Sequence, residues 1–380
     1  MPRPVYLDCA ATTAMDARVA ELVIRLFTEE FGNAGSRTHV YGAAAQSEVA
    51  TARRRVAETL DADPEEVVFT SGATESDNLA ILGFATFGTA EGRRHIISTA
   101  IEHKAVLEPL ARLREDGFEV TLVHPDRSGH VAAEEVLAAV RPDTLMISVM
   151  HANNETGAIQ PIAEIADGLD PGGPFFHVDA AQTYGRETKT LCNRRIDLVS
   201  ISGHKVFGPK GVGALLVRRR AGRRLPLRPL MVGGGQERGL RPGTQPVPLI
   251  AGLGLAAELA EQERERRREV CAQMRSCALQ AFASLKPIVH GDPNRGVLPY
   301  ILSLAIPGLD SEAVMVALKD QIAISNGSAC TSVRYEPSHV LTAMGLSGAE
   351  LEGTIRLSWS HATPDVPWDN VAAALSDLRM

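Results

Sequence analysis

The sequence predicts an α/β fold with a mainly parallel sheet, on the strength of two observations. Between Val67 and Val217, short runs rich in β-branched residues alternate with stretches of helical composition. The chain has 380 residues, 44% of them hydrophobic, which is enough to bury at least one large core. Such alternation is typical of an α/β domain. The expected strands are Val67–Thr70, His95–Ser98, Val120–Val123, Leu145–Val149, Phe175–Val178, Asp197–Ser200 and Ala214–Val217.

The pattern changes after the Gly/Pro-rich segment 233–248. A long helix is expected there, and its stretch 258–269 is so charged that one face must be solvated. The tail from residue 299 offers one more strand-like run, Tyr300–Leu304, with helices and loops. We therefore expect a large domain at residues 15–256. A smaller α+β domain would combine residues 1–14 with residues 257–380.

Composition excludes several classes of function. The net charge is −7 with both signs interspersed, so the chain has no basic footprint for direct nucleic-acid or membrane binding. No run approaches the roughly 18 apolar residues of a membrane helix, and no signal-peptide segment follows Met1. We expect a cytoplasmic protein. Its five cysteines contain no CxxC pair, so neither a disulfide framework nor a metal cage is indicated.

A lysine follows one of the expected strands on a glycine-bounded turn. Lys205 lies in the segment Ser202-Gly203-His204-Lys205-Val206-Phe207-Gly208. An amine on a rigid turn can hold pyridoxal 5′-phosphate (PLP) as a Schiff base, while neighbouring hydroxyl and imidazole groups hold the phosphate. Taken alone, the segment equally fits an ordinary surface turn.

Other expected strand ends carry polar groups that suit the same cofactor. Asp179 could pair with the pyridine nitrogen and Gln182 could bond the phenolic oxygen, although an aspartate there could also cap the next helix. The segment Thr70–Asn78 leads from a strand into a helix, whose start could bind phosphate or could be a plain capping box. His103 and Asn154 follow two further strands, where a structural histidine and an Asx-rich turn are the alternatives.

In this order and with these separations, the segments resemble the cysteine desulfurases of the NifS/IscS type, in the class V aminotransferase family. The resemblance covers the chain from Val5 to about Leu378, including Leu7–Thr13, Gly32–Ser36, Gly233–Thr244 and Ile355–Ser358. Each motif is weak alone, but the ordered set is specific. The resemblance implies a PLP-dependent transferase of fold type I, with a seven-stranded sheet in the large domain.

Ser325-Asn326-Gly327-Ser328-Ala329-Cys330-Thr331-Ser332 looks like the SSGSACTS signature, in which a nucleophilic cysteine lies on a mobile loop. Small and polar neighbours favour an exposed, reactive thiolate at Cys330, whereas an inert cysteine normally lies among apolar residues. Cys9, Cys192, Cys271 and Cys277 have no partner motif, and we assign them no chemistry.

The resemblance also assigns roles to individual residues. Lys205 would hold PLP and abstract the α-proton of the substrate, His103 would stack on the ring, and Cys330 would take the sulfur. The remaining implied contacts are Asp179 to the ring nitrogen, Gln182 to the ring oxygen, Ala73, Thr74, Ser202 and His204 to the phosphate, Thr244 to the phosphate of a neighbouring subunit, Asn154 to the cofactor, and Asn33, Asn154 and Arg356 to the substrate carboxylate.

The expected reaction converts L-cysteine to L-alanine and leaves a persulfide on Cys330. The implied partners are a second copy of the chain and a sulfur-acceptor protein from iron-sulfur assembly, tRNA thiolation or DNA phosphorothioation. The alternatives are a selenocysteine lyase or another class V PLP enzyme, and a non-catalytic partner that kept the fold. The last is disfavoured because Lys205, Asp179 and Cys330 are all present.

Three features depart from the common family pattern. They are Ala34-Gly35 in place of a proline-containing version, Asn326 in place of a serine, and Trp359-Ser360-His361 where glycine and arginine are frequent. They put the shapes of loops in doubt. The chain ends at Met380, before the C-terminal extension of housekeeping members, which leaves the sulfur acceptor open.

Overall fold

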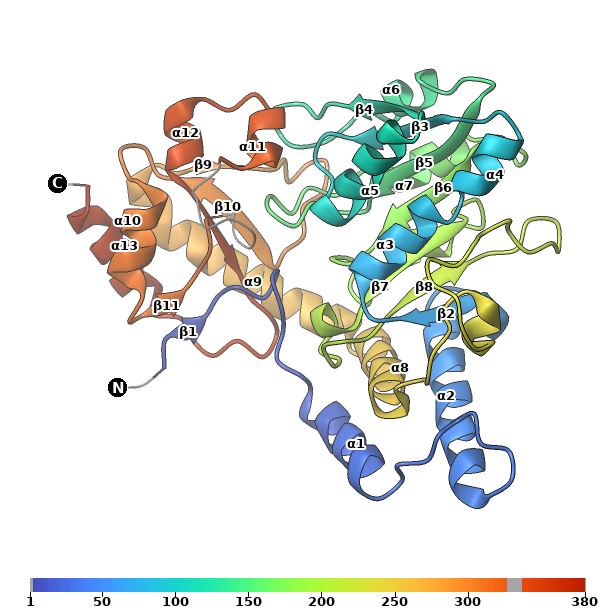
Figure 1. The fold of residues 1–380 in the computed structure, drawn as a ribbon. Helices are drawn as coiled ribbons and strands as arrows, with labels where there is room; N and C mark the ends of the chain where they lie inside the picture. Colours follow the sequence, from blue (N-terminus) through green and yellow to red (C-terminus); the bar gives the residue numbers. More distant parts are fainter. Residues whose placement is uncertain (1–2, 327–336, 380) are drawn as a thin grey trace.

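The computed structural model describes residues 3–326 and 337–379. Its central feature is a seven-stranded sheet with the order β2-β8-β7-β6-β5-β3-β4 (Figure 1). All neighbouring strands are parallel except β8, which runs antiparallel to both β2 and β7. The expected fold class, a mainly parallel seven-stranded sheet with a smaller α+β part, is therefore confirmed.

The elements follow one another as the sequence pattern indicates. The strands are β1 (Val5–Tyr6), β2 (Val67–Thr70), β3 (His95–Thr99), β4 (Glu119–Val123), β5 (Thr144–Met150), β6 (Phe175–Asp179), β7 (Leu198–Ser202), β8 (Gly213–Val217), β9 (Ile288–Val289), β10 (Ile301–Ala305), β11 (Ile322–Ala323) and β12 (Thr354–Ser358). The α-helices are α1 (Ala17–Thr28), α2 (Val40–Glu58), α3 (Ala73–Leu82), α4 (Ala85–Ala90), α5 (Lys104–Glu115), α6 (Ala133–Ala138), α7 (Ile162–Asp167), α8 (Val247–Gln262), α9 (Arg264–Phe282), α10 (Ser311–Leu318), α11 (His339–Ala343), α12 (Gly348–Glu352) and α13 (Trp368–Asp377).

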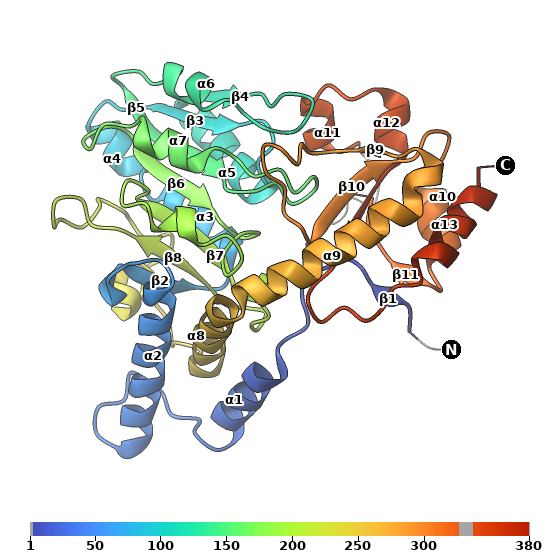
Figure 2. The ribbon, with the colours of Figure 1, turned by 180° about the vertical axis from the view of Figure 1, so that it is seen from behind.

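Alternate residues of the large sheet enter two separate cores. On β7, Val199 and Ile201 join the core that α2, α7 and α8 cover, whereas Leu198 joins the core beneath α3 and α5. This is the period-two alternation of a strand that is buried on both faces. Helices α3 and α5 cover one face in Figure 1, and α7 covers the other in Figure 2. The sheet is thereby held between helices, with its carboxyl edge free to form a site.

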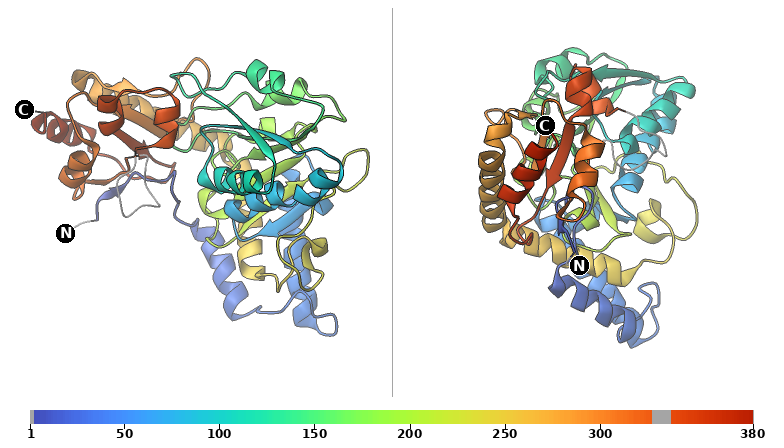
Figure 3. Two further views of the ribbon diagram at one scale, coloured as in Figure 1. Left: turned by 45° about the horizontal axis from the view of Figure 1, so that its top comes forward. Right: turned by 90° about the vertical axis from the view of Figure 1, so that its left-hand side faces the viewer.

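A third core surrounds the smaller sheet β12-β10-β9. The N-terminal strand β1 pairs in parallel with β11, far along the chain. Helix α9 follows α8 directly and extends into this second part of the molecule (Figure 2), where Cys271, Ala278 and Phe282 join its core. Both views of Figure 3 show the two ends of the chain in this part. Separate cores support our proposal of a large domain at 15–256 and a small domain made of 1–14 with 257–380.

The loops above the sheet contain a buried acid. Glu102 lies between β3 and α5 and is completely buried. Its Oε1 accepts hydrogen bonds from Thr99 Oγ1 at 2.7 Å and from the Met150 N–H at 2.9 Å, which links the ends of β3 and β5. Burial raises the pKa of Glu102 from 4.5 to about 8. The folded chain therefore favours the protonated acid.

We predict that Glu102→Gln weakens the loss of stability at alkaline pH. A raised pKa in the folded state stabilises the protein at low pH, and this contribution is lost as pH rises from about 4.5 to about 8. Glutamine keeps the shape of the protonated acid but cannot ionise. Thermal unfolding between pH 5 and 9 should show a shallower decline for the variant. Glu108→Gln, an exposed position on α5, serves as the control, and equal slopes for all three proteins would contradict the prediction.

Candidate active site

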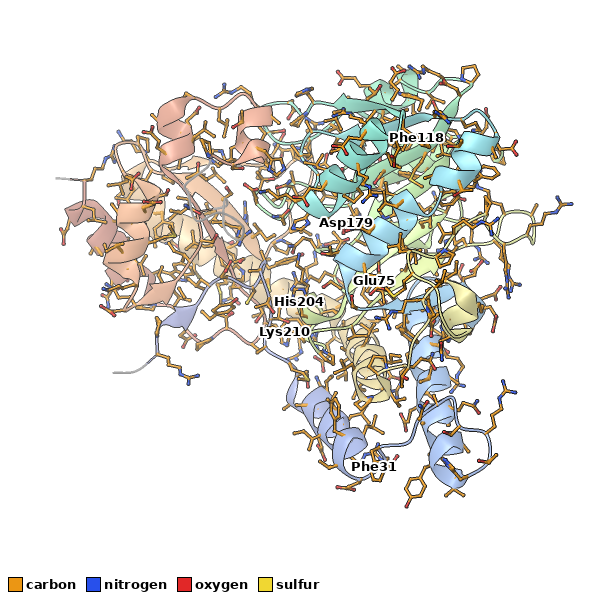
Figure 4. The ribbon with its side chains drawn as sticks, in the orientation of Figure 1. Phe31, Glu75, Phe118, Asp179, His204 and Lys210 are labelled. Atoms are coloured by element: carbon orange, nitrogen blue, oxygen red, sulfur yellow. The ribbon has the colours of Figure 1, made fainter. Side chains whose placement is uncertain are left out.

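A cavity of about 470 Å³ lies at the carboxyl edge of the large sheet. This volume is within the range of about 300–1,000 Å³ that is usual for small-molecule sites. Figure 4 shows Asp179, Glu75, His204 and Lys210 in this region, between the sheet and the small domain. The lining residues are Ala11, Thr12, Ser71, Gly72, Ala73, Thr74, Glu75, Asp77, His103, Met150, Ala152, Asn154, Asp179, Ala181, Gln182, Ser202, His204, Lys205, Lys210 and Gly211.

Lys205 and Asp179 lie in this cavity because the strands that carry them are neighbours. Asp179 ends β6, and Lys205 is in the 3₁₀ turn Gly203–Lys205 directly after β7. Burial lowers the pKa of Lys205, and the Asp179 charge opposes that shift. Burial also raises the pKa of Asp179 to about 6, against the N–H of Ala181, which donates to its Oδ1 at 2.8 Å. An amine with a depressed pKa next to a carboxylate is suited to proton transfer.

Two buried polar side chains of the cavity have unused hydrogen-bonding atoms. Gln182 donates through Nε2 to the Ala10 carbonyl at 2.9 Å, but its Oε1 has no partner among the described residues. The hydroxyl of Ser202, at the end of β7, is likewise without a partner in that part of the chain. Buried polar groups are normally satisfied, and a missing ligand is one explanation for an exception. Both atoms therefore indicate a polar ligand.

Helix α3 directs its N-terminus at the cavity, where Gly72, Ala73 and Thr74 form part of the lining. No described side chain caps this helix, so its first N–H groups are available to an anion. The turn is close-packed against the sheet. A Cβ at Gly213 would lie 2.6 Å from the Gly72 Cα, which only glycine permits. Lys210 adds a positive charge to the lining.

Two histidines flank the cavity. His103 caps α5, where its Nδ1 accepts from the Ala105 N–H at 3.1 Å. Burial lowers its pKa, although the Asp179 charge opposes this. His204 Nδ1 is 3.2 Å from Thr12 Oγ1, and burial lowers the pKa of His204 to about 4. Burial therefore disfavours the charged form of both rings.

Arg356 is on β12 of the smaller sheet and reaches the edge of the cavity through its contact with Asn154, although it is not among the lining residues. Its Nη2 donates to Asp8 Oδ1 at 2.6 Å and its Nη1 donates to the Asn154 carbonyl at 3.0 Å. The side chain is buried, and its Nε has no partner within residues 3–326 and 337–379. The guanidinium is therefore oriented from two sides while one donor stays available for a carboxylate.

The structure brings most of the expected site residues together but not all of them. Asn33 lies on the exposed segment between α1 and α2, and Thr244 is exposed; neither lines the cavity of this single chain. Cys330 lies outside the described residues. Burial raises the thiol pKa of Cys9 and Cys192, and that of Cys271 to about 11, which disfavours a reactive thiolate at each.

Sequence reasoning missed several residues of the site. Asp77 and Lys210 line the cavity, and Asp8 is the ion-pair partner of Arg356. Asp77 belongs to the segment Thr70–Asn78, but its residue type also suits a first helical turn. Asp8 belongs to Leu7–Thr13, but its partner is 348 positions away in the sequence. Only the folded chain shows these relationships.

The donor set fits PLP. The start of α3, together with Ser202, His204 and Lys210, suits a phosphate. The carboxylate of Asp179 suits a pyridinium nitrogen. The side-chain amide of Gln182, whose Oε1 has no partner among the described residues, suits a polar substituent of the ring. Lys205 supplies the amine that such a cofactor requires.

No helix in the described part of the chain is long and apolar enough to cross a membrane.

Comparison with known proteins agrees with this site. The family model described as aminotransferase class V matches residues 5–365. The chain is 44% identical over 387 residues to the cysteine desulfurase IscS of Acinetobacter baumannii, covering 100% of this chain and 94% of that protein. The crystal structure of DndA from Streptomyces lividans has 52% identity, a TM-score of 0.82, and coverage of 93% of this chain and 99% of that one. A structure described as SspA in complex with cysteine has 38% identity, a TM-score of 0.80, and coverage of 93% and 98%.

Class V aminotransferases use PLP, the cofactor that the donor set fits. The family model spans nearly the whole chain, and the relative covers all of it. The chain therefore belongs to the class V aminotransferase family and is a PLP-dependent enzyme.

Proposed function

We propose that this chain is a cysteine desulfurase, which converts L-cysteine to L-alanine and carries the sulfur on Cys330 as a persulfide. The observation that carries the proposal is the cavity that places Lys205 beside Asp179 at the start of α3. Two relatives support the choice of substrate, since one is described as cysteine desulfurase IscS and another is described in complex with cysteine. When bound, PLP would withdraw electrons from the amino acid and so allow its carbon–sulfur bond to break.

Each residue of the cavity would have a separate role in the reaction. Lys205 Nζ would accept the α-proton of cysteine, and burial, which lowers the pKa of Lys205, favours the neutral amine that this step needs. Asp179 would keep the ring nitrogen protonated, while Gln182 and His103 would orient the ring. Phosphate would be held by Ala73 and Thr74 at the start of α3, with Ser202 and His204.

The substrate carboxylate would meet Arg356, with Asn154 beside it. Cys330 would attack the cysteine sulfur, forming a sulfur–sulfur bond as the carbon–sulfur bond breaks. The bonding electrons would pass to the carbon fragment, which becomes alanine after it takes up protons. Cys330 lies outside the described residues, and its role therefore rests on the sequence signature.

A homodimer would complete the site. Five large apolar side chains, Ile24, Phe27, Phe31, Val40 and Tyr41, are exposed on α1, at the start of α2 and between them. The rings of Phe31 and Tyr41 stack with centroids 5.7 Å apart at the tip labelled in Figure 4. A second exposed apolar run, Leu230–Val232, precedes Thr244. Clusters of exposed large apolar side chains are typical of an interface. A second copy covering it would bring Asn33 or Thr244 toward a neighbouring cavity.

The acceptor of the sulfur would be a protein of iron-sulfur assembly, tRNA thiolation or DNA phosphorothioation, and a cytoplasmic location is part of this proposal. A selenocysteine lyase is the alternative with the same fold and cofactor.

Replacement of Cys330 tests the function and the nucleophile together. Wild-type protein should show the visible absorbance of bound PLP and form alanine from L-cysteine in the presence of a reducing thiol. Cys330→Ala should keep the absorbance but lose alanine formation, because no thiolate can accept the sulfur. Cys277→Ala, on the exposed face of α9, should behave like wild type. Alanine formed by Cys330→Ala would refute the persulfide step, and faster turnover of selenocysteine by both proteins would favour the lyase.

Arg356→Lys should raise the KM for cysteine about ten- to hundredfold, which corresponds to the loss of one charge-assisted hydrogen bond of about 1.5–3 kcal/mol. The ammonium of lysine cannot reproduce the fork that contacts Asp8 and the Asn154 carbonyl. Steady-state kinetics would measure the effect, with PLP absorbance as a check on the fold. Arg275→Lys, a buried arginine elsewhere in the small domain, should leave KM near its wild-type value. An unchanged KM in Arg356→Lys would remove Arg356 from the substrate site.

The dimer can be tested on its exposed apolar surface. Light scattering should give wild-type protein a mass of twice 40.7 kDa, and Phe31→Asp should shift it toward 40.7 kDa because a charge is costly in a dry interface. Val316→Asp, at an equally exposed valine on α10, should leave the dimer intact. A wild-type protein of 40.7 kDa, or a Phe31→Asp variant of unchanged mass, would argue against this surface.

A further inference from the structure

The cavity contains a second aspartate, Asp77, to which the proposed function assigns no role. Asp77 is on α3, one turn after the helix start, and its side chain is only 1% exposed. Neither carboxylate oxygen makes a hydrogen bond of normal geometry with the described residues. Asp77 also contributes to the lining of the cavity. Burying a carboxyl that has only weak polar contacts is costly, which points to a role that a neutral residue would not fill.

His177 lies next to this carboxyl and connects it to the strand of Asp179. Its Nε2 is 3.5 Å from Asp77 Oδ1. The ring is fixed between two serines, with Nδ1 at 2.8 Å from Ser148 Oγ and Nε2 at 2.9 Å from Ser200 Oγ. His177 and Asp179 are two positions apart on β6 and therefore point to the same face of the sheet. Asp77 and Asp179 thus approach the same space from the helix and from the strand.

The titratable neighbours of Asp77 come from each element packed around it. Asp179 and His177 belong to β6, Lys205 to the turn after β7, and Glu102 to the turn before α5, with His103 capping that helix. Burial raises the pKa of Asp77 to about 7, against smaller effects of the Ser200 hydroxyl and Lys205. Asp77 in turn raises the pKa of Asp179, where it is the largest cause after burial. The charge of Asp77 therefore acts on Asp179.

We propose that Asp77 is a positioning residue for PLP, which acts through Asp179 by adding a second negative charge to the field at the ring nitrogen. The inference rests on the proposed function, because it assumes that Asp179 faces that nitrogen. Ionised Asp77 in a poorly solvated cavity stabilises positive charge on the bound cofactor, and that positive charge in turn favours the ionised forms of both carboxyls. Its removal weakens this field without removing any direct contact to the cofactor.

The test is a pH titration of the visible absorbance of PLP-loaded protein. In Asp77→Asn, the midpoint of the absorbance change should move to lower pH, because the lost negative charge no longer stabilises the protonated cofactor. The shift should be about half to one pH unit, the effect of one buried charge on the order of 10 Å from the titrating group. Asp77→Ala should shift the midpoint in the same direction, because it removes the same charge without adding an amide. Asp77→Glu, which keeps the charge, should restore a midpoint close to that of wild type.

Ser76→Ala is the matched control. Ser76 is the buried neighbour of Asp77 on the same helix and bonds Thr70 Oγ1 at 2.8 Å, but it carries no charge. A helix start that is merely disturbed would shift both variants, whereas the field of Asp77 predicts a shift only in its own neutral variants.

The remaining outcomes also decide the question. An unchanged midpoint in PLP-loaded Asp77→Asn or Asp77→Ala overturns the inference. Neutral variants that fold but bind no PLP, or that do not fold, would assign Asp77 a structural role and overturn it as well. Failure of the proposed function would instead appear in the wild type, as absent PLP absorbance or absent alanine formation. The two failures are therefore distinguishable.

Discussion

The balance of buried charge at the carboxyl edge of the seven-stranded sheet is the constraint on which the rest of this structure depends. Lys205 is a buried amine in a cavity that also contains Asp179 and Asp77, with Glu102 close by. Burying ionised groups is expensive unless they are paired. As a result, the pKa values of Asp77, Glu102 and Asp179 are raised, and the pKa of Lys205 is lowered. A cofactor that carries a protonated ring and a phosphate offers charges that match this cavity and the start of α3.

The same edge of the sheet is where the two parts of the chain meet. Tyr300 of the small domain donates its hydroxyl to the Gln182 carbonyl, and the Arg186 guanidinium lies 3.6 Å from the centre of the Tyr300 ring. Arg186 also donates to the Lys205 carbonyl at 3.0 Å. Glu155, which accepts a hydrogen bond from Ser338, provides a further contact between the parts. These contacts join the part of the chain that contains Tyr300 to the turn that carries Lys205. They thereby hold Arg356 near the cavity.

Much of the fold could be predicted because strands buried on both faces have a strong local signal. Each of the seven expected runs of the large sheet is a strand whose ends differ from the prediction by at most two residues. The short strands β1, β9 and β11 have two residues each, too few for any periodicity, and they form only because distant segments pair. The antiparallel direction of β8 was likewise not predicted, although the ten residues between β7 and β8 are fewer than the dozen or more that a parallel crossover needs. In the site, Lys205, Asp179, Gln182 and Thr74 could be found because strand ends converge. Asp77 and Asp8 could not, because their importance comes from neighbours that are remote in sequence.

By itself the sequence determined the α/β class, the strands of the large sheet and the family, since these depend on local hydrophobic pattern and on the order of motifs. It also supplied the chemical groups of the site and the cysteine signature around Cys330. The tertiary structure decided which groups share a cavity, how far burial moves their pKa values, and which charges oppose each other. Asn33 and Thr244 lie outside the cavity of one chain, whereas Asp77 lies within it. The physical reason is that burial and Coulomb interactions depend on distances through space, which the positions of residues along the chain do not fix.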